Sequence, residues 1–412
     1  MTVFSALIFA TGDGKRMKSE KAKEVHKICG SEMINHIVHT AFEAGAGCTC
    51  VIVPERTVEI ADAVSGRAEC ICLNDAGASA NIKAFLEKTE NVMVLLGDMP
   101  LITDKTLKDA VMEHLGENND VTFLGNGLND DYRNLGAYII KAEKLTGLTD
   151  VSEGTVTEKI RDITKNGANF GVYNVDDADE LMRINDRIEL AAAAKVMQRR
   201  INTNLMLGGV TIIDPDNTFI CKDAVIGIDT VIYPGTVIEG KTVIGKNVYI
   251  GPNCRLINAT IGDETDVNIS TIVESVVGSK THIGPYAYIR PGCNIGSGCK
   301  VGDFVELKKA QIGDGTKLSH LTYVGDAEVG CNVNFGCGTV VVNYDGKNKY
   351  KTVIKDNAFI GCNSNLVSPV TVNEGAYIAA GSTITDEVPE NTLAIARARQ
   401  VIKENWQDRR KK

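Results

Sequence analysis

The chain has 412 residues, of which 24% are charged and 43% are hydrophobic, and these proportions are ordinary for a soluble enzyme of two or three domains. Its net charge of −9 argues against a nucleic-acid-binding protein, so an anionic substrate requires a local group of Lys and Arg side chains. No apolar run reaches the roughly 20 residues of a membrane span, and the first residues lack the basic segment of a signal peptide, so we expect a cytoplasmic protein.

The 12 cysteines do not have the spacing of a zinc site. Cys48 and Cys50 stand two residues apart, as do Cys70 and Cys72, which is the spacing of one face of a strand. We interpret the cysteines as small, reduced core residues of a cytosolic protein.

Residues 1–185 alternate between short apolar strands and helices. This alternation predicts a doubly wound, Rossmann-like parallel sheet of the nucleotidyltransferase type. The expected strands are VFSALIFA, CTCVIVP, AECICLN and NVMVLLGD, and the expected helices are SEMINHIVHTAFEAGA and ANIKAFLEKTE.

Two places in this region suit a phosphate-bearing ligand. Gly12 and Gly14 follow the first strand, where glycine lets the backbone turn tightly and bring its amides to a phosphate, while Arg16 and Lys23 add positive charge. Asp98 stands at the carboxyl end of the fourth strand, the edge at which open α/β sheets bind ligands, and its oxygens can hold Mg²⁺. The alternative for Asp98 is an ordinary turn residue.

An Ala-rich helical linker is expected over residues 186–208, and a regular repeat follows over residues 209–396. In this repeat an aliphatic residue recurs at every sixth position, as in TVIYPG, TVIEGK, TVIGKN and VYIGPN. A period of six spreads around all faces of an α-helix, but it is typical of a left-handed parallel β-helix with an internal aliphatic ladder. Residues 397–412 form a basic tail that is expected to end in a short helix.

The repeat is broken twice, over residues 302–330 and 334–352, and insertions on a solenoid often form its binding site. The order of the whole chain resembles the family of bifunctional N-acetylglucosamine-1-phosphate uridylyltransferases/glucosamine-1-phosphate N-acetyltransferases. The segment GDGKRMKSEKAKEVHKICG resembles the loop of sugar-nucleotide pyrophosphorylases, and the resemblance is closest from DRIELA to the end. It implies UDP-N-acetylglucosamine biosynthesis from glucosamine 1-phosphate, acetyl-CoA and UTP, by a homotrimer with sites between neighbouring β-helices.

In the N-terminal domain the resemblance implies that Asp98 and Asn185 hold Mg²⁺ and that Asn134 contacts the sugar, with helix capping as the alternative for Asn185. Here the chain also departs from the family. In residues 74–80, NDAGASA, the Gln, Thr and His that hold uracil are absent, Ala22 replaces a proline, and the acceptor-sugar segment has no counterpart. We therefore expect either attack of a sugar phosphate on the α-phosphorus of UTP, or a domain kept for folding, regulation or another ligand.

In the β-helix the resemblance assigns the general base to His320, in the segment HLTY. Acetyl transfer to an amine needs a base, and imidazole titrates in the suitable range. Glu306 is expected to orient the ring or to balance its charge. The alternative for a lone histidine is a structural role.

The remaining ligand contacts are also implied by the resemblance, with solvated surface charges as the alternative. Arg grips a phosphate as a fork and Lys as a point charge, while Asn and Tyr bind hydroxyls. The expected sugar-phosphate contacts are Arg290, Lys308, Tyr323 and Asn334. The expected acetyl-CoA contacts are Cys337, Asn343, Tyr344, Lys349, Cys362, Ala380 and Arg397.

Cys337 and Cys362 stand where the family commonly has Ala and Ser. Both are small, so we expect the channel to stay open, and direct transfer needs no acyl-enzyme on cysteine. Three other functions remain as alternatives: a nucleotidyltransferase whose β-helix serves trimer assembly, an acetyltransferase with a non-catalytic N-terminal domain, and a scaffold or sugar-nucleotide sensor.

Overall fold

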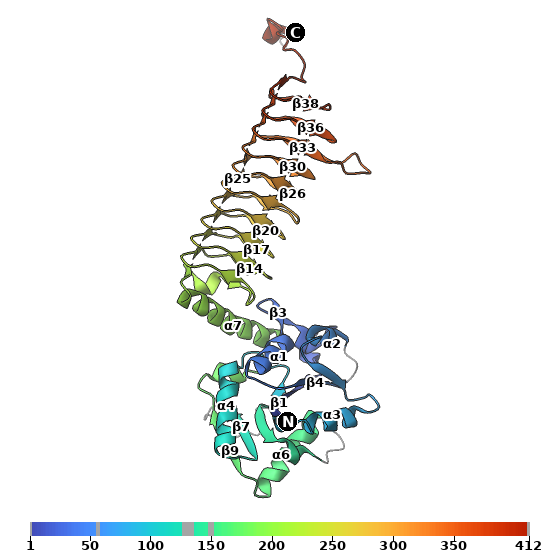
Figure 1. The fold of residues 1–412 in the computed structure, drawn as a ribbon, viewed down its shortest axis with the longest axis vertical. Helices are drawn as coiled ribbons and strands as arrows, with labels where there is room; N and C mark the ends of the chain where they lie inside the picture. Colours follow the sequence, from blue (N-terminus) through green and yellow to red (C-terminus); the bar gives the residue numbers. More distant parts are fainter. Residues whose placement is uncertain (1, 55–57, 126–135, 147–151, 410–412) are drawn as a thin grey trace. The chain divides into compact units, whose positions relative to one another are not determined.

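The computed structural model describes residues 2–54, 58–125, 136–146 and 152–409 of the chain. Contacts divide the chain into two compact units, Met1–Arg200 and Ile201–Lys412, and the boundary between them falls inside the helix α7 (Arg187–Leu207) (Figure 1). Each unit has its own buried apolar core.

The first unit is built on a seven-stranded sheet with the order β5-β4-β1-β6-β8-β7-β9. Strands β5, β4, β1 and β6 run parallel, because a helix lies on each connection between successive members. The expected strands and helices of this region are confirmed. The strands are β1 (Thr2–Phe9), β4 (Thr49–Val53), β5 (Glu69–Cys72), β6 (Thr89–Leu96), β7 (Val121–Gly125), β8 (Tyr138–Lys141) and β9 (Phe170–Asn174).

The sheet is mixed rather than wholly parallel. Strand β8, between β6 and β7, runs antiparallel to both, so the predicted parallel arrangement holds for the first four strands and not at β8. Antiparallel neighbours need no crossover helix, and the alternation of strand and helix accordingly stops after α4.

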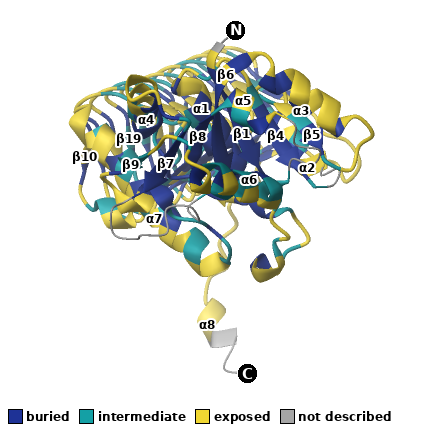
Figure 2. Cartoon of the chain, turned by 90° about the horizontal axis from the view of Figure 1, so that it is seen from below, coloured by how far each residue is buried: buried dark blue, intermediate teal, exposed yellow. Residues whose placement is uncertain are grey.

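The helices of the first unit bury one side against this sheet and expose the other, whereas its central strands are almost wholly buried (Figure 2). Their stability comes from this amphipathic packing. The helices are α1 (Met33–Glu43), α2 (Val58–Val64), α3 (Ala78–Leu86), α4 (Asp104–Gly116), α5 (Ala142–Leu145) and α6 (Glu153–Lys165), and a small hairpin joins β2 (Lys27–Ile28) to β3 (Ser31–Glu32).

The second unit is the left-handed parallel β-helix that the repeat predicts. Each coil contributes one short strand to each of three parallel sheets of 11, 10 and 9 strands. Most strands bury one aliphatic residue, and these residues stack in register from coil to coil, as Ile232, Ile250 and Val267 do. The ladder keeps the register of every residue outside it, including those of the candidate site.

The strands of the β-helix are listed here by sheet. The first sheet holds β10 (Thr211–Ile212), β13 (Val231–Ile232), β16 (Tyr249–Ile250), β19 (Asp266–Val267), β22 (His282–Ile283), β25 (Lys300–Asp303), β28 (Lys317–His320), β31 (Asn334–Phe335), β34 (Phe359–Ile360), β37 (Tyr377–Ile378) and β39 (Leu393–Ala394). The second holds β11 (Phe219–Ile220), β14 (Val237–Glu239), β17 (Arg255–Ile257), β20 (Thr271–Val273), β23 (Tyr288–Ile289), β26 (Glu306–Lys308), β29 (Tyr323–Gly325), β32 (Val340–Val342), β35 (Asn365–Val367) and β38 (Thr383–Ile384). The third holds β12 (Val225–Ile226), β15 (Val243–Ile244), β18 (Thr260–Ile261), β21 (Val276–Val277), β24 (Asn294–Ile295), β27 (Gln311–Ile312), β30 (Ala327–Val329), β33 (Thr352–Ile354) and β36 (Val370–Val372).

A short helix, α8 (Trp406–Arg409), follows the last coil. None of the helices in the described residues combines the length and the apolar character needed to cross a membrane. All 12 cysteines lie in the described residues, and none of them is joined to another in a disulfide.

Candidate functional site

His320, the candidate base, is the last residue of β28 and lies at a corner of the coil. Its Nδ1 is 2.5 Å from Oδ1 of Asp303, the last residue of β25, and the two residues are in register. This hydrogen bond holds the pKa of the Asp303 carboxyl below its ordinary value. Because the carboxylate accepts a hydrogen bond from a protonated Nδ1, Nε2 is left as the basic nitrogen of the ring. The side chain of His320 is 54% exposed, so Nε2 is open to a substrate.

The carboxylate that contacts His320 is therefore Asp303, whereas the sequence predicts Glu306 in this position. Glu306 begins β26 and accepts a hydrogen bond from Nη1 of Arg290 at 2.8 Å. The reason is register, because the residue beside His320 lies one coil earlier, 17 positions back, at Asp303. Counting one coil back from His320 could have identified it from the sequence.

Residues predicted to bind acetyl-CoA continue the position of His320 along the β-helix. Strands β28, β31, β34 and β37 are neighbours in one sheet. Their aligned buried residues are Leu318, Phe335, Ile360 and Ile378. The residues two places beyond these are His320, Cys337, Cys362 and Ala380. Neighbouring strands lie about 4.8 Å apart, so these four residues form a row, the His320 column, along one edge of the coil.

Backbone hydrogen bonds continue along the His320 column past the strands themselves. The amide of Asn363 donates to the carbonyl of Cys337, and the amide of Gly381 donates to the carbonyl of Cys362, each at 2.8 Å. Cys362 and Ala380 are exposed and Cys337 is half-buried. Arg397 lies at the far end of the column, where its Cδ is 3.7 Å from the position of a Cβ on Gly381.

Three cations gather beside the next corner of the coil, at the opposite end of the second-sheet strands from His320. Arg290 and Lys308 follow the aligned residues Ile289 and Leu307, so they occupy equivalent positions on adjacent coils. The nearby ammonium of Lys349 is the main cause that lowers the pKa of Lys308 below its ordinary value. Like charges in such proximity favour the binding of an anion between them.

Tyr323 and Asn343 meet above a glycine in this group. Tyr323 begins β29, and a Cβ on Gly325 would lie 2.4 Å from the Tyr323 hydroxyl and 2.8 Å from Nδ2 of Asn343. A side chain at position 325 would therefore displace both groups. Nδ2 of Asn343 also donates to Oδ2 of Asp326 at 2.5 Å.

The loop that leaves the coil before β33 carries Tyr344 and Lys349 (Figure 1). It closes on itself through a bridge between these two residues and a 2.9 Å hydrogen bond from the Tyr350 amide to the Asn343 carbonyl. A cleft of about 360 Å³ lies beside it, lined in part by Asp326 and Lys349. Asn334 begins β31, in register with Lys317, and is half-buried. It lies three residues before Cys337 on the same coil.

In the first unit the structure brings together two of the predicted residues. Nζ of Lys23 lies 2.6 Å from Oδ2 of Asp98, and both side chains are buried. Gly12 lies over this pair, because a Cβ there would be 2.9 Å from Nζ of Lys23. Gly14 has a φ of 60°, which only glycine adopts without strain, and Arg16 is exposed in the adjoining 3-10 turn.

Arg183, which sequence reasoning missed, also binds Asp98. Its Nη2 is 3.1 Å from Oδ2 of Asp98, and its Nε is 3.3 Å from Oδ1. The contact joins residues 85 positions apart, so no local sequence pattern predicts it.

The predicted metal site does not fit the observed arrangement. Asp98 and Asn185 offer the oxygen ligands that Mg²⁺ prefers, but both carboxylate oxygens of Asp98 are hydrogen-bonded to cationic side chains. Within the described residues no group of three His, Cys, Asp or Glu side chains could hold a metal ion. The cap of α7 is Asp186, whose Oδ1 accepts from two backbone amides, and not Asn185. Asn134 lies outside the described residues.

The segment of residues 74–80 follows β5, at the edge of the sheet where the loops after β1 and β6 also lie. Apart from Ala78 its residues are exposed. A cleft of about 520 Å³ at this edge is lined by Thr11, Leu73 and the start of α6. A ligand of the first unit is therefore expected at this edge.

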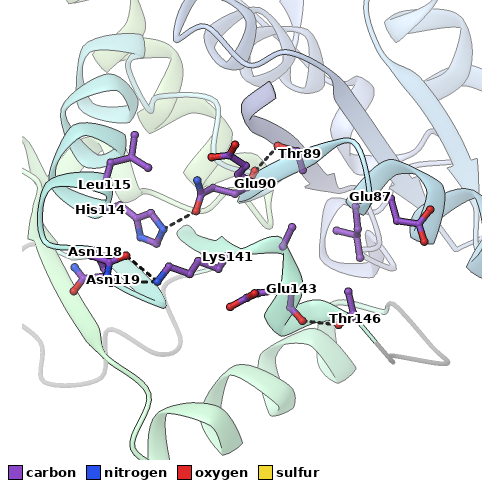
Figure 3. A pocket seen from close by; sticks show the side chains of 13 residues that line it. Glu87, Thr89, Glu90, His114, Leu115, Asn118, Asn119, Lys141, Glu143 and Thr146 are labelled. Atoms are coloured by element: carbon purple, nitrogen blue, oxygen red, sulfur yellow. Dashed lines mark hydrogen bonds between the residues drawn. The ribbon is translucent and has the colours of Figure 1, made fainter. Parts of the chain in front are cut away.

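A second cavity, of about 620 Å³, lies where β6 begins and contains none of the predicted residues (Figure 3). Its imidazole, His114, is buried, with Nδ1 2.8 Å from Oγ1 of Thr122 and Nε2 3.1 Å from Oδ1 of Asn91. Burial lowers the pKa of His114 to about 4. Lys141 is held by Asn118 and Asp120. These polar groups satisfy one another, which identifies a structural network.

Family models match three parts of the chain. A MobA-like NTP transferase domain matches residues 6–130, a GMPPB C-terminal domain matches residues 216–293, and a bacterial transferase hexapeptide repeat matches residues 351–386. Together with the fold, these matches define a transferase in which an NTP-transferase domain precedes a hexapeptide β-helix.

Curated relatives identify the family. The chain is 45% identical to Bifunctional protein GlmU of Acetivibrio thermocellus, with 98% of this chain and 97% of that one covered. It is 42% identical to the protein of the same name from Clostridioides difficile strain 630, with 99% and 98% covered, and 43% identical to that of Caldanaerobacter subterraneus, with 98% of each covered. The chain belongs to the GlmU family of bifunctional proteins, as its motifs predict. The first alignment runs over 449 positions, so that relative has segments that this 412-residue chain lacks.

Proposed function

We propose that the β-helix transfers the acetyl group of acetyl-CoA to the amine of glucosamine 1-phosphate, with His320 as the general base. The His320 column is the observation that supports this most. It sets an exposed imidazole, fixed by Asp303 through Nδ1, at one end of a row of small side chains. A narrow donor with a thioester can lie along such a row and present its carbonyl carbon beside the imidazole.

In the reaction the amine nitrogen attacks the thioester carbonyl while Nε2 of His320 takes a proton from it. The tetrahedral intermediate then collapses, the carbon–sulfur bond breaks, and the imidazolium returns the proton to the leaving CoA sulfur. Asp303 keeps the ring in the tautomer that has Nε2 free. The products are N-acetylglucosamine 1-phosphate and CoA.

The cations beside the next corner supply the charge that the two substrates require. Arg290 and Lys308 would bind the phosphate of the sugar, with Tyr323 near its hydroxyls, while Lys349 and Asn343 would contact acetyl-CoA. Cys337 and Cys362 would line the path of the pantetheine arm, and Arg397, which lies beyond Ala380, would bind a CoA phosphate.

We also propose that the chain works as a homotrimer in the cytoplasm. The outer face of the β-helix carries stacked, half-exposed rings such as Tyr286 and Phe304, whose centroids are 5.4 Å apart and which a neighbouring copy could cover. Cysteines without disulfides suit a reducing compartment. Light scattering should give three times the chain mass of 44.3 kDa.

The match to an NTP transferase domain favours a second activity for the first unit, the transfer of UMP from UTP to N-acetylglucosamine 1-phosphate. Residues 74–80, without the family's base-binding side chains, and the internal pairing of Asp98 oppose it.

Two assays with purified protein separate these functions. Glucosamine 1-phosphate and acetyl-CoA should release CoA thiol, and the absence of release would contradict the main proposal. N-acetylglucosamine 1-phosphate, UTP and Mg²⁺ should be assayed separately for pyrophosphate, whose release would establish the second activity.

A further inference from the structure

The position of a divalent cation beside Asp98 is filled by a side chain of the protein. Asp98 lies two residues after the end of β6 and is only 3% exposed. One oxygen accepts from both Lys23 and Arg183, and the other accepts from Nε of Arg183. Neither oxygen is left without a cationic donor.

Arg183 also faces a second carboxylate. Its Nη2 is 3.9 Å from Oε1 of Glu153, at the start of α6, and Oε2 of Glu153 accepts a 3.0 Å hydrogen bond from Oγ1 of Thr11. The guanidinium thus lies between acids from two separate elements, which is the way proteins commonly hold a divalent metal.

The backbone fixes this placement. The amide of Ile184, the residue after Arg183, donates a 2.9 Å hydrogen bond to the carbonyl of Asp98. The buried Lys23 is confined by the close approach of Gly12. Two cations and two carboxylates balance at this point, and the neighbouring Glu24 is buried, which raises the pKa of its carboxyl.

We propose that Arg183 is a built-in cation that replaces a divalent metal at Asp98, so that the first unit has no metal site there. A metal ion could reach Asp98 only by expelling the guanidinium, since a second cation at the same oxygens would be repelled by Arg183 and Lys23. This inference concerns the first unit alone and does not depend on acetyl transfer by the β-helix.

Mn²⁺ binding, measured by electron paramagnetic resonance on the full chain with and without UTP, tests the proposal. The natural protein should show no bound Mn²⁺ that depends on Asp98. Arg183→Ala should create one Mn²⁺ site per chain, occupied at Mn²⁺ concentrations at which the natural protein binds none at Asp98. Arg187→Ala is the matched control, because Arg187 binds Met17 and His26 rather than Asp98.

A second variant shows where the gained ion binds. Lys23→Gln/Asp98→Asn keeps a polar pair in the buried position, so it should fold when Asp98→Asn alone does not. Added to Arg183→Ala, it should abolish the new site. Mn²⁺ bound by the natural protein and lost in Lys23→Gln/Asp98→Asn, in either the presence or the absence of UTP, would overturn the proposal, as would an Arg183→Ala protein that folds by circular dichroism and gains no site.

Discussion

The two units handle charge in opposite ways. At Asp98 the first unit pairs each charge with a partner and buries the pair, whereas the second unit leaves the imidazole of His320 exposed and holds Lys308 beside Lys349, ready for other partners. A buried, compensated set of charges costs much to disturb and has little left to offer a ligand. An exposed set with adjacent like charges is stabilised by binding an anion. The difference indicates where this chain carries out chemistry.

Removing the base should have the largest effect on the exposed site. His320→Ala should lower kcat for thiol release from acetyl-CoA by about 10²- to 10⁴-fold, the usual contribution of a general base. His282→Gln is a matched control, because His282 also binds a carboxylate, Asp266, at 2.5 Å on the same sheet but outside the His320 column. Equal losses in both variants would show that histidine–carboxylate pairs serve the coil rather than the reaction.

The stability of the first unit should depend on pH through the buried His114. Its folded pKa of about 4 lies below the usual 6.5, so the unfolded chain binds a proton more readily and stability is lost as the pH falls from about 6.5 to 4. The loss from this group is about 3 kcal/mol. Hydrogen exchange of peptides from β6 and α4 should show this fall in the natural protein and a smaller one in His114→Gln. An unchanged pH slope would contradict the assignment.

Weakening the anion group should affect binding more than the chemical step. Lys308→Gln should raise KM for glucosamine 1-phosphate by about ten- to a hundredfold, the usual worth of a hydrogen bond to a charged group, with little change in kcat. The control is Lys351→Gln, because Lys351 is already paired with Glu328. If both variants raise KM equally, general charge rather than the position of Lys308 is responsible.

The smallest effect is expected at Asp303, which acts through His320. Asp303→Asn should lower kcat about tenfold and leave both KM values unchanged, because only the tautomer and orientation of the ring are disturbed. A rise in KM for either substrate would indicate that Asp303 contacts the substrate instead.

The sequence predicts the fold of both units because their patterns are local. A six-residue period can be recognised within one coil. Each of the strands β1, β4, β5 and β6 is recognisable as a short run of apolar residues. Antiparallel β8 was missed because strand direction depends on the connection and not on the strand itself.

The site was predictable where resemblance or spacing reached it, as for His320, and not where partners meet across the fold. Residue type alone does not distinguish Asp303 from Glu306, but Asp303 lies one coil back from His320, as the pairing of β25 with β28 shows. Arg183 meets Asp98 across the fold, which no motif of either segment encodes.

The His320 column also restricts how this chain can change over time. One coil advances 17 residues from Asp303 to His320, whereas the coil with the protruding loop takes 25 from Cys331 to Asp356. Elsewhere in the same sheet the aligned buried residues advance by 16 to 18 residues per coil, as from Ile250 to Val267, Ile283 and Val301, so a corner absorbs one or two residues without loss of register. Longer insertions in this enzyme are therefore expected to accumulate in the loop, or to arise by duplication of whole coils, each of which would lengthen the edge by about 4.8 Å.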